Sequence, residues 1–170
     1  MEISKNFNKP QFGARLVRAN VKLGSSRWKN VEKIFKVNTI EAPNDKFIVG
    51  SCEDGSYYLT LDHNNNYFDS LPLPFKKLFD WVMRLSDEQL ADRFTKLYKG
   101  MKLKQNARRA IKNTDLKDIH AIDKLERNYV QSIRQLYKDD KEMLNTYIRG
   151  LGWKGGVEPF FRENSLIFDI

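Results

Sequence analysis

The segment KFIVGSCEDGSYYLTLD, residues 46–62, has the pattern of a β-hairpin. Two runs rich in β-branched and aromatic residues flank a turn with Asp54 and Gly55 at its centre, a pair typical of tight hairpin turns. Three asparagines at 64–66 mark a second turn, and the run that begins at Tyr67 predicts a third strand. The sequence therefore predicts an antiparallel meander in the first half of the chain.

Before the hairpin, the sequence predicts one more strand and one helix. Apolar and polar residues alternate over 17–23, which is the period of a half-buried strand. Trp28, Val31 and Phe35 then recur at helical spacing, until the pattern ends near the EAPND turn at 41–45. The first half of the chain thus combines strands with a single helix.

Beyond residue 74 the apolar residues follow the helical period of 3.6 through most of the chain. The pattern predicts helices over 75–85, 86–112 and 115–149, and it leaves open whether each of the last two ranges is one helix or two. Strand-like character returns in SLIFDI, residues 165–170, which could add an edge to the N-terminal sheet.

These patterns predict an α+β fold, with a small antiparallel sheet packed against a helical C-terminal half. A chain of 170 residues, 41% of them hydrophobic, is large enough for one core, so we expect a single domain over 1–170. Within it, we expect 1–73 to be mostly strands with one helix and 74–150 to be helical. Residues 151–170 are expected to form a glycine turn and a terminal strand.

The composition indicates a soluble protein in a reducing compartment. No run approaches the roughly 18 apolar residues of a membrane span, and the N-terminal residues lack the apolar segment of a signal peptide. The single cysteine, Cys52, excludes an internal disulfide. We therefore expect a cytoplasmic protein without a membrane partner.

The glycines of IRGLGWKGGVE fall into the spacing G-x-G-x-x-G of dinucleotide-binding loops. In those loops the glycines follow a strand and open a helix, whereas here they follow the longest helical pattern and precede Pro159. We interpret them as a helix end and a chain turn, and we expect no nucleotide cofactor. A positive φ is expected at one or more of Gly150, Gly152, Gly155 and Gly156.

The sequence gives no signal of a metal or catalytic site. His63 and His120 are the only histidines, and neither has a second ligand at helical spacing. Cys52 follows an apolar run, which predicts a small buried residue rather than a nucleophile. We therefore expect these three side chains not to converge, with no metal, no cofactor and no catalytic residue, and an enzyme is the least favoured class.

The net charge of +8 is matched by a single acid-poor segment, residues 93–112. Its eight basic residues, with no acid after Arg93, are Arg93, Lys96, Lys99, Lys102, Lys104, Arg108, Arg109 and Lys112. Over a helix, Lys104, Arg108 and Lys112 share one side at a spacing of four residues. A solvated helix face is the ordinary explanation of such a pattern, but eight uncompensated charges exceed what solubility needs.

We interpret these eight residues as a binding surface for nucleic acid, because clustered cations attract the phosphate backbone. The function predicted is that of a small non-enzymatic binding or regulatory protein, which holds RNA or DNA mainly through phosphates and with low sequence specificity. The alternative is a protein-interaction module, such as an adaptor, inhibitor or immunity-type protein, whose basic face binds an acidic protein partner.

Overall fold

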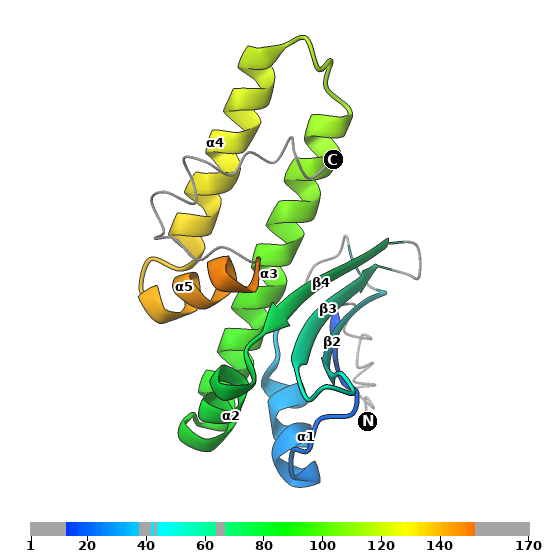
Figure 1. Cartoon of the computed structure of the whole chain (residues 1–170), viewed down its shortest axis with the longest axis vertical. Helices are drawn as coiled ribbons and strands as arrows, with labels where there is room; N and C mark the ends of the chain where they lie inside the picture. Colours follow the sequence, from blue (N-terminus) through cyan, green and yellow to red (C-terminus); the bar gives the residue numbers. More distant parts are fainter. Residues whose placement is uncertain (1–12, 38–41, 43, 64–66, 152–170) are drawn as a thin grey trace, which may run out of the picture.

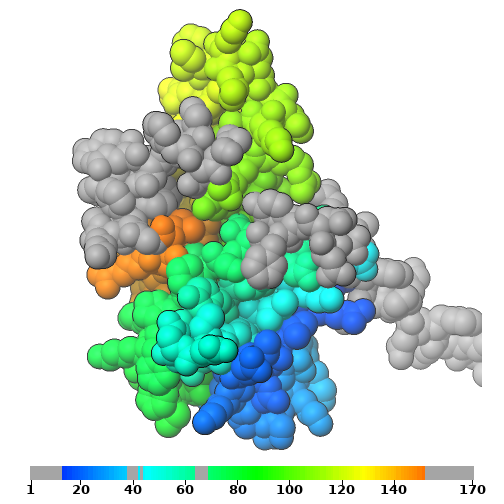
Figure 2. All heavy atoms as spheres, turned by 45° about the vertical axis from the view of Figure 1, so that its right-hand side comes forward, coloured from blue at the N-terminus to red at the C-terminus, as the bar shows by residue number. Residues whose placement is uncertain are grey.

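The computed structural model describes residues 13–37, 42, 44–63 and 67–151. In chain order, the elements are β1 (Arg15–Arg18), α1 (Ser25–Ile34), β2 (Asp45–Ser51), β3 (Tyr57–His63), β4 (Tyr67–Leu73), α2 (Phe75–Arg84), α3 (Asp87–Lys112), α4 (Ile119–Leu136) and α5 (Lys141–Gly150). Helix α3 runs lengthwise through the molecule, with the sheet and α1 on one side and α4 on the other (Figure 1). The connection between α3 and α4 forms one end of the molecule (Figure 2). The predicted α+β class is confirmed.

The sheet has the strand order β1-β2-β3-β4. Strands β2, β3 and β4 form the predicted antiparallel meander, in which Asp45 lies opposite His63 and Ser51 lies opposite Tyr57. Strand β1 pairs with β2 in the parallel direction, because the chain between them crosses over through α1. The sheet is therefore mixed, and its one parallel pair joins β1 to β2, the first strand of the meander.

The first strand is shorter than the alternation over 17–23 predicts, since β1 ends at Arg18. Asn20 has a φ of 56°, in the left-handed region that asparagine tolerates, and it turns the chain away from the strand direction. The hydroxyl of Ser51 donates a hydrogen bond to the carbonyl oxygen of Asn20. Val21 and Leu23 are buried in the core without belonging to the strand.

The two open questions about the helices have different answers. Helix α3 is continuous from Asp87 to Lys112 and starts with a capping box between Ser86 and Gln89. The range 115–149 contains two helices, α4 and α5, which begin after separate aspartate caps at Asp118 and Asp140. The described residues from 74 to 151 thus form a series of four helices joined by short connections.

The core lies between the sheet and α3. The ring of Phe47 on β2 lies 5.9 Å from that of Tyr98 and 6.5 Å from that of Phe94, both on α3, in edge-to-face geometry. Phe35, just after α1, stacks on Phe47 at 6.1 Å and meets the ring of Tyr98 edge-on at 6.2 Å. These contacts fix the position of α3 relative to the start of β2.

A group of buried tyrosines fixes α4 and α5 to the other side of α3. Tyr137 donates a hydrogen bond to the carbonyl oxygen of Lys96, and the hydroxyls of Tyr129 and Tyr147 lie 3.2 Å apart. A β-carbon at Gly100 would lie 2.8 Å from the hydroxyl oxygen of Tyr137. The rings therefore approach the backbone of α3 closely only because residue 100 has no side chain.

The C-terminal glycines follow a helix, as the sequence predicts. Gly150 is the last residue of α5, where a β-carbon would lie 2.7 Å from the carbonyl oxygen of Pro72 on β4. Within the described residues the only glycine with a positive φ is Gly55, in the β2–β3 turn, so Gly150 does not supply the positive φ expected at one or more of the four C-terminal glycines. Gly152, Gly155, Gly156 and the strand predicted at 165–170 lie outside the described residues.

Candidate functional site

A cleft of about 990 Å³ lies between α3 and α4, next to the end of β3. Helix α3 lines it with Tyr98, Lys99, Lys102, Leu103, Asn106 and Arg109. Helix α4 lines it with Asn128, Gln131, Ser132, Gln135 and Leu136, while Ala42 and His63 complete the lining. The cleft combines cationic and amide side chains, which is the composition of a site for a charged, hydrogen-bonding ligand.

The carboxylate of Asp45 holds three of the polar groups beside the cleft. Asp45 is the first residue of β2 and is completely buried. One of its oxygens lies 3.0 Å from Nζ of Lys102 and accepts a hydrogen bond of 2.9 Å from the hydroxyl of Tyr98. The other oxygen pairs with Nδ1 of His63. This single acid therefore connects β2, β3 and α3 where they meet the cleft.

The charge of Asp45 is maintained by these partners. Burial alone would raise the pKa of the Asp45 carboxyl, but the hydrogen bonds from His63, Lys102 and Tyr98 together lower it below its ordinary value. The buried group is thus an ionised carboxylate at neutral pH. Because Lys102 is paired with it, the charge of Lys102 is in part compensated.

The two walls of the cleft differ in chemistry. On α3, Lys99 and Arg109 are exposed and form no ion pair with any described acid, and Lys102 lies between them. On α4, the lining side chains carry no charge: Asn128, Gln131 and Gln135 are exposed amides at a spacing of three and four residues. One wall is therefore cationic, and the other offers paired hydrogen-bond donors and acceptors.

The eight basic residues predicted to bind nucleic acid do not share one face. Lys99, Lys102 and Arg109 line the cleft. Because each residue turns a helix by about 100°, Lys104 and Arg108 lie on roughly the opposite side of α3. Both of these side chains are partly buried and have interaction partners, whereas Lys112 is exposed at the end of the helix. The structure thus brings together three of the eight.

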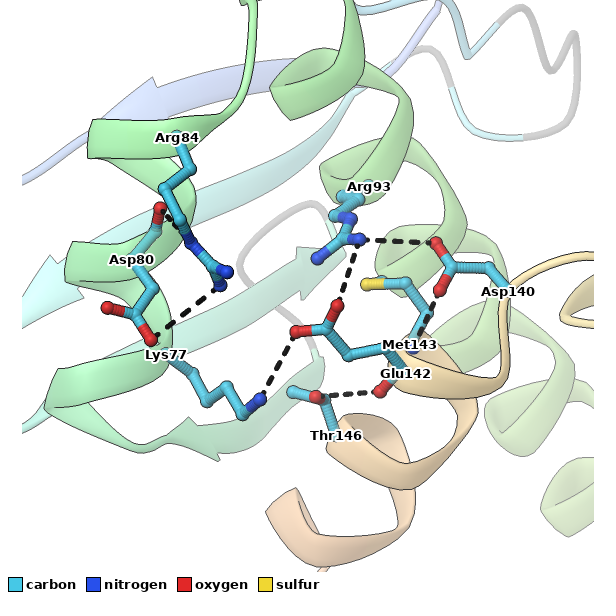
Figure 3. Close-up of polar contacts among 8 residues, drawn as sticks. All are labelled: Lys77, Asp80, Arg84, Arg93, Asp140, Glu142, Met143 and Thr146. Carbon is cyan, nitrogen blue, oxygen red and sulfur yellow. Dashed lines mark hydrogen bonds and ion pairs between the residues drawn. The ribbon is translucent and has the colours of Figure 1, made fainter.

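Arg93 is part of the packing between helices rather than of the cleft. Its guanidinium lies 3.6 Å from Asp140 and 3.4 Å from Glu142 at the start of α5, and it stacks 5.1 Å from the ring centroid of Trp81. Lys77 of α2 pairs with the same Glu142 (Figure 3). The side chain of Arg93 is accordingly compensated by two acids and shielded by an aromatic ring.

Lys96, the next basic residue along α3, forms an ion pair of 3.0 Å with Asp92 one turn earlier. This acid lies just outside the segment counted from Arg93, so the segment's eight charges overstate its excess positive charge. Arg93 and Lys96 therefore have structural partners on α3 and α5, as Lys102 does in Asp45.

Cys52 is exposed, and the prediction that it is a small core residue is wrong. The apolar run that suggested burial ends with β2 at Ser51, so Cys52 lies in the turn that follows. His63 is at the opposite end of the β2–β3 pair, and His120 is in the first turn of α4. As expected, Cys52 lies apart from His63. Among the described residues, no three His, Cys, Asp or Glu side chains are grouped so that they could hold a metal ion.

Sequence reasoning did not find the roles of Asp45 and His63. Each was assigned to a turn or to the end of a strand, and their pairing depends on the β2–β3 register together with the docking of α3. The amide wall is visible in the sequence, because Asn128, Gln131 and Gln135 are spaced so that they fall on one helical face.

Comparisons with protein-family models, with curated proteins and with solved structures found no match. In the described part of the chain, no helix combines the length and the apolar character needed to cross a membrane.

Proposed function

We propose that this protein binds nucleic acid and that the cleft between α3 and α4 is its binding site. The observation that supports this most strongly is the pair Lys99 and Arg109, two exposed cations without an acid partner among the described residues, beside a wall of amides. Phosphate groups bind such cations, and amide side chains hydrogen-bond to sugars, phosphates and base edges. A cytoplasmic location, expected from the single cysteine, belongs to the same proposal.

The cleft suits the binding of phosphates rather than the reading of a base sequence by a helix inserted into a groove. The lining includes three cationic side chains, and only one of them, Lys102, is paired with a carboxylate, so the site carries an excess of positive charge. Much of the affinity would then come from the release of counterions from the phosphates, which depends on salt and little on sequence. Low specificity for RNA or DNA sequences follows from this balance.

The test is a titration of labelled RNA and DNA at several salt concentrations. The double variant K99E/R109E should bind more weakly, and the slope of log affinity against log salt should fall by about one and a half to two units. The matched control is K104E/R108E, which changes the same two residue types on the other side of α3 and should lose much less of the slope. Circular dichroism confirms that both variants fold.

Two results would overturn the proposal. One is a wild-type protein that retains neither RNA nor DNA at about 50 mM salt, where electrostatic binding is strong. The other is an equal loss of slope in the two double variants, which would move the binding site away from the cleft. The first result would favour the alternative function, an interaction module for an acidic protein partner.

A further inference from the structure

We infer that the ligand of this cleft is a single strand, with its phosphates along α3 and its bases turned toward α4; this inference rests on the proposed function. The observation behind it is the separation of chemistry between the two walls. Every cationic group of the α3–α4 lining is on α3, and the lining side chains of α4 include three amides and no charge.

The spacing along α3 suits a chain of phosphates. Lys99, Lys102 and Arg109 lie on one side of the helix over about 15 Å, at a rise of about 1.5 Å per residue. The ion pair with Asp45 fixes the side chain of Lys102 in the middle of this row. A nucleic-acid backbone that follows α3 therefore meets Lys99 and Arg109 at the two ends of the row. Between them it meets Lys102, whose position is fixed by Asp45.

The spacing along α4 suits bases. Asn128, Gln131 and Gln135 form a row on the facing side, and each amide group offers both a donor and an acceptor. Such groups pair with the edges of any of the four bases, as asparagine and glutamine do with adenine in the major groove. Weak preference between sequences is consistent with amide side chains that have no hydrogen-bond partner among the described residues.

The position of the amides favours a single strand over a duplex. Proteins read the bases of a duplex by inserting a protruding helix into the groove, whereas these amides line a recess between two packed helices. Bases reach a recess only when they are unstacked and turned out of the strand. A volume of about 990 Å³ is at the upper end of the range for small-ligand sites, so it accepts a short run of nucleotides.

The experiment compares four ligands by fluorescence anisotropy over the same series of salt concentrations: a 12-nucleotide single strand, its duplex, an abasic strand of equal length and a mononucleotide. We expect the single strand to bind about tenfold more tightly than the duplex or the abasic strand, because only it presents bases to the amides. The mononucleotide, with a single phosphate group, should compete only at much higher concentration.

The variant N128A/Q131A/Q135A removes the amide wall without changing the charge. It should lower affinity for the single strand about tenfold while leaving the salt slope and the abasic-strand affinity unchanged. The control is N145A, which removes an exposed amide of α5 that does not line the cleft. It should bind all four ligands as the wild type does.

The outcomes separate this inference from the proposed function. If no ligand binds the wild type in a salt-dependent way, the proposed function fails. If duplex or abasic strand binds as tightly as the single strand, or if the amide variant binds normally, nucleic-acid binding stands and the inference is wrong. If the mononucleotide competes as well as the strand, the cleft is a site for free nucleotides, and the single-strand inference is again wrong.

Discussion

The hydroxyl of Tyr147 donates a hydrogen bond of 3.1 Å to the carbonyl oxygen of Gly100 and so joins α5 to the middle of α3. Burial, together with the neighbouring Tyr129 and Tyr137, raises the pKa of Tyr147 well above the ordinary value for tyrosine. The hydroxyl therefore keeps its proton, and remains a donor, at any pH at which the protein is studied.

We expect Gly100→Ala to destabilise the protein, although alanine favours helix by about 1 kcal/mol over glycine. The new β-carbon would lie 2.8 Å from the hydroxyl oxygen of Tyr137 and 3.0 Å from a ring carbon of Tyr147. Because both rings are buried and hydrogen-bonded to α3, they cannot move aside freely, and a net loss of about 1–3 kcal/mol is expected. Urea denaturation measures it.

The control for this substitution is Gly50→Ala, since a β-carbon at residue 50 would make only ordinary contacts with Ala19. This variant should be as stable as the wild type or slightly more stable, because alanine costs less backbone entropy in a strand. A Gly100→Ala protein as stable as the wild type would show that the tyrosines are not held in place.

We expect Asp45→Asn to cost about 3 kcal/mol at neutral pH, because it removes the charge that compensates Lys102 in a buried site. The effect should depend on pH. Folding lowers the pKa of Asp45 below its ordinary value of 3.8, so its stabilising contribution is complete above that value and is lost as the pH falls through the folded pKa. The difference between wild type and variant should therefore shrink below about pH 4.

Denaturation at pH 7 and at pH 3 measures this difference. The matched control is Asp92→Asn, which breaks an exposed ion pair with Lys96 and should change the free energy of unfolding little at either pH. An Asp45→Asn protein whose deficit is the same at both values would show that the carboxylate charge is not what stabilises the site.

Arg93→Lys should lower stability by about 1 kcal/mol, although it keeps the charge. Lysine has no planar guanidinium that can stack on Trp81 while its nitrogen contacts Asp140 and Glu142. The same substitution at Arg84, which pairs with Asp80 on the surface of α2, is the control and should have an effect within about 0.5 kcal/mol. Thermal denaturation compares the two.

The salt dependence of nucleic-acid binding should be unchanged in Arg93→Lys, because this side chain has structural partners and lies outside the cleft. A large change in the salt slope would return Arg93 to the binding surface that its sequence position suggested.

The thiol of Cys52 should react with one equivalent of a disulfide reagent in the native protein, because it is exposed in the β2–β3 turn. The measurement is the absorbance of the coloured thiolate that the reagent releases, recorded with and without denaturant. The Cys52→Ser variant should release no coloured thiolate in either condition. Reaction only after unfolding would show that the thiol is buried, as the sequence pattern suggested.

The elements that the sequence predicted well are those determined by local signals. The hairpin turn at Gly55 and the capping box at Ser86 each depend on residues within four positions of one another. The parallel direction of β1 was not predicted, because it follows from the crossover through α1 rather than from any residue within the strand. Asn20 ended that strand early through its backbone conformation, which alternation of side chains does not show.

For the candidate site, the sequence predicted the cations but not their arrangement. A helical period identified α3, yet which side of a helix faces another helix depends on tertiary packing, and the basic residues were divided between the cleft and the opposite side. Asp45 could not be identified because its partners are 18, 53 and 57 residues away, on β3 and α3. Such a site exists only after the sheet and the helix have docked.

The short first strand also affects how the folded protein behaves at high concentration. No described element pairs with the outer edge of β1, and an unpaired edge can recruit a strand from another molecule. β1 has only four residues, with arginines at both ends, Arg15 and Arg18. An edge this short is a poor template for a strand from another molecule, and its arginines repel those of a second copy. The mixed sheet is therefore protected from aggregation at this edge.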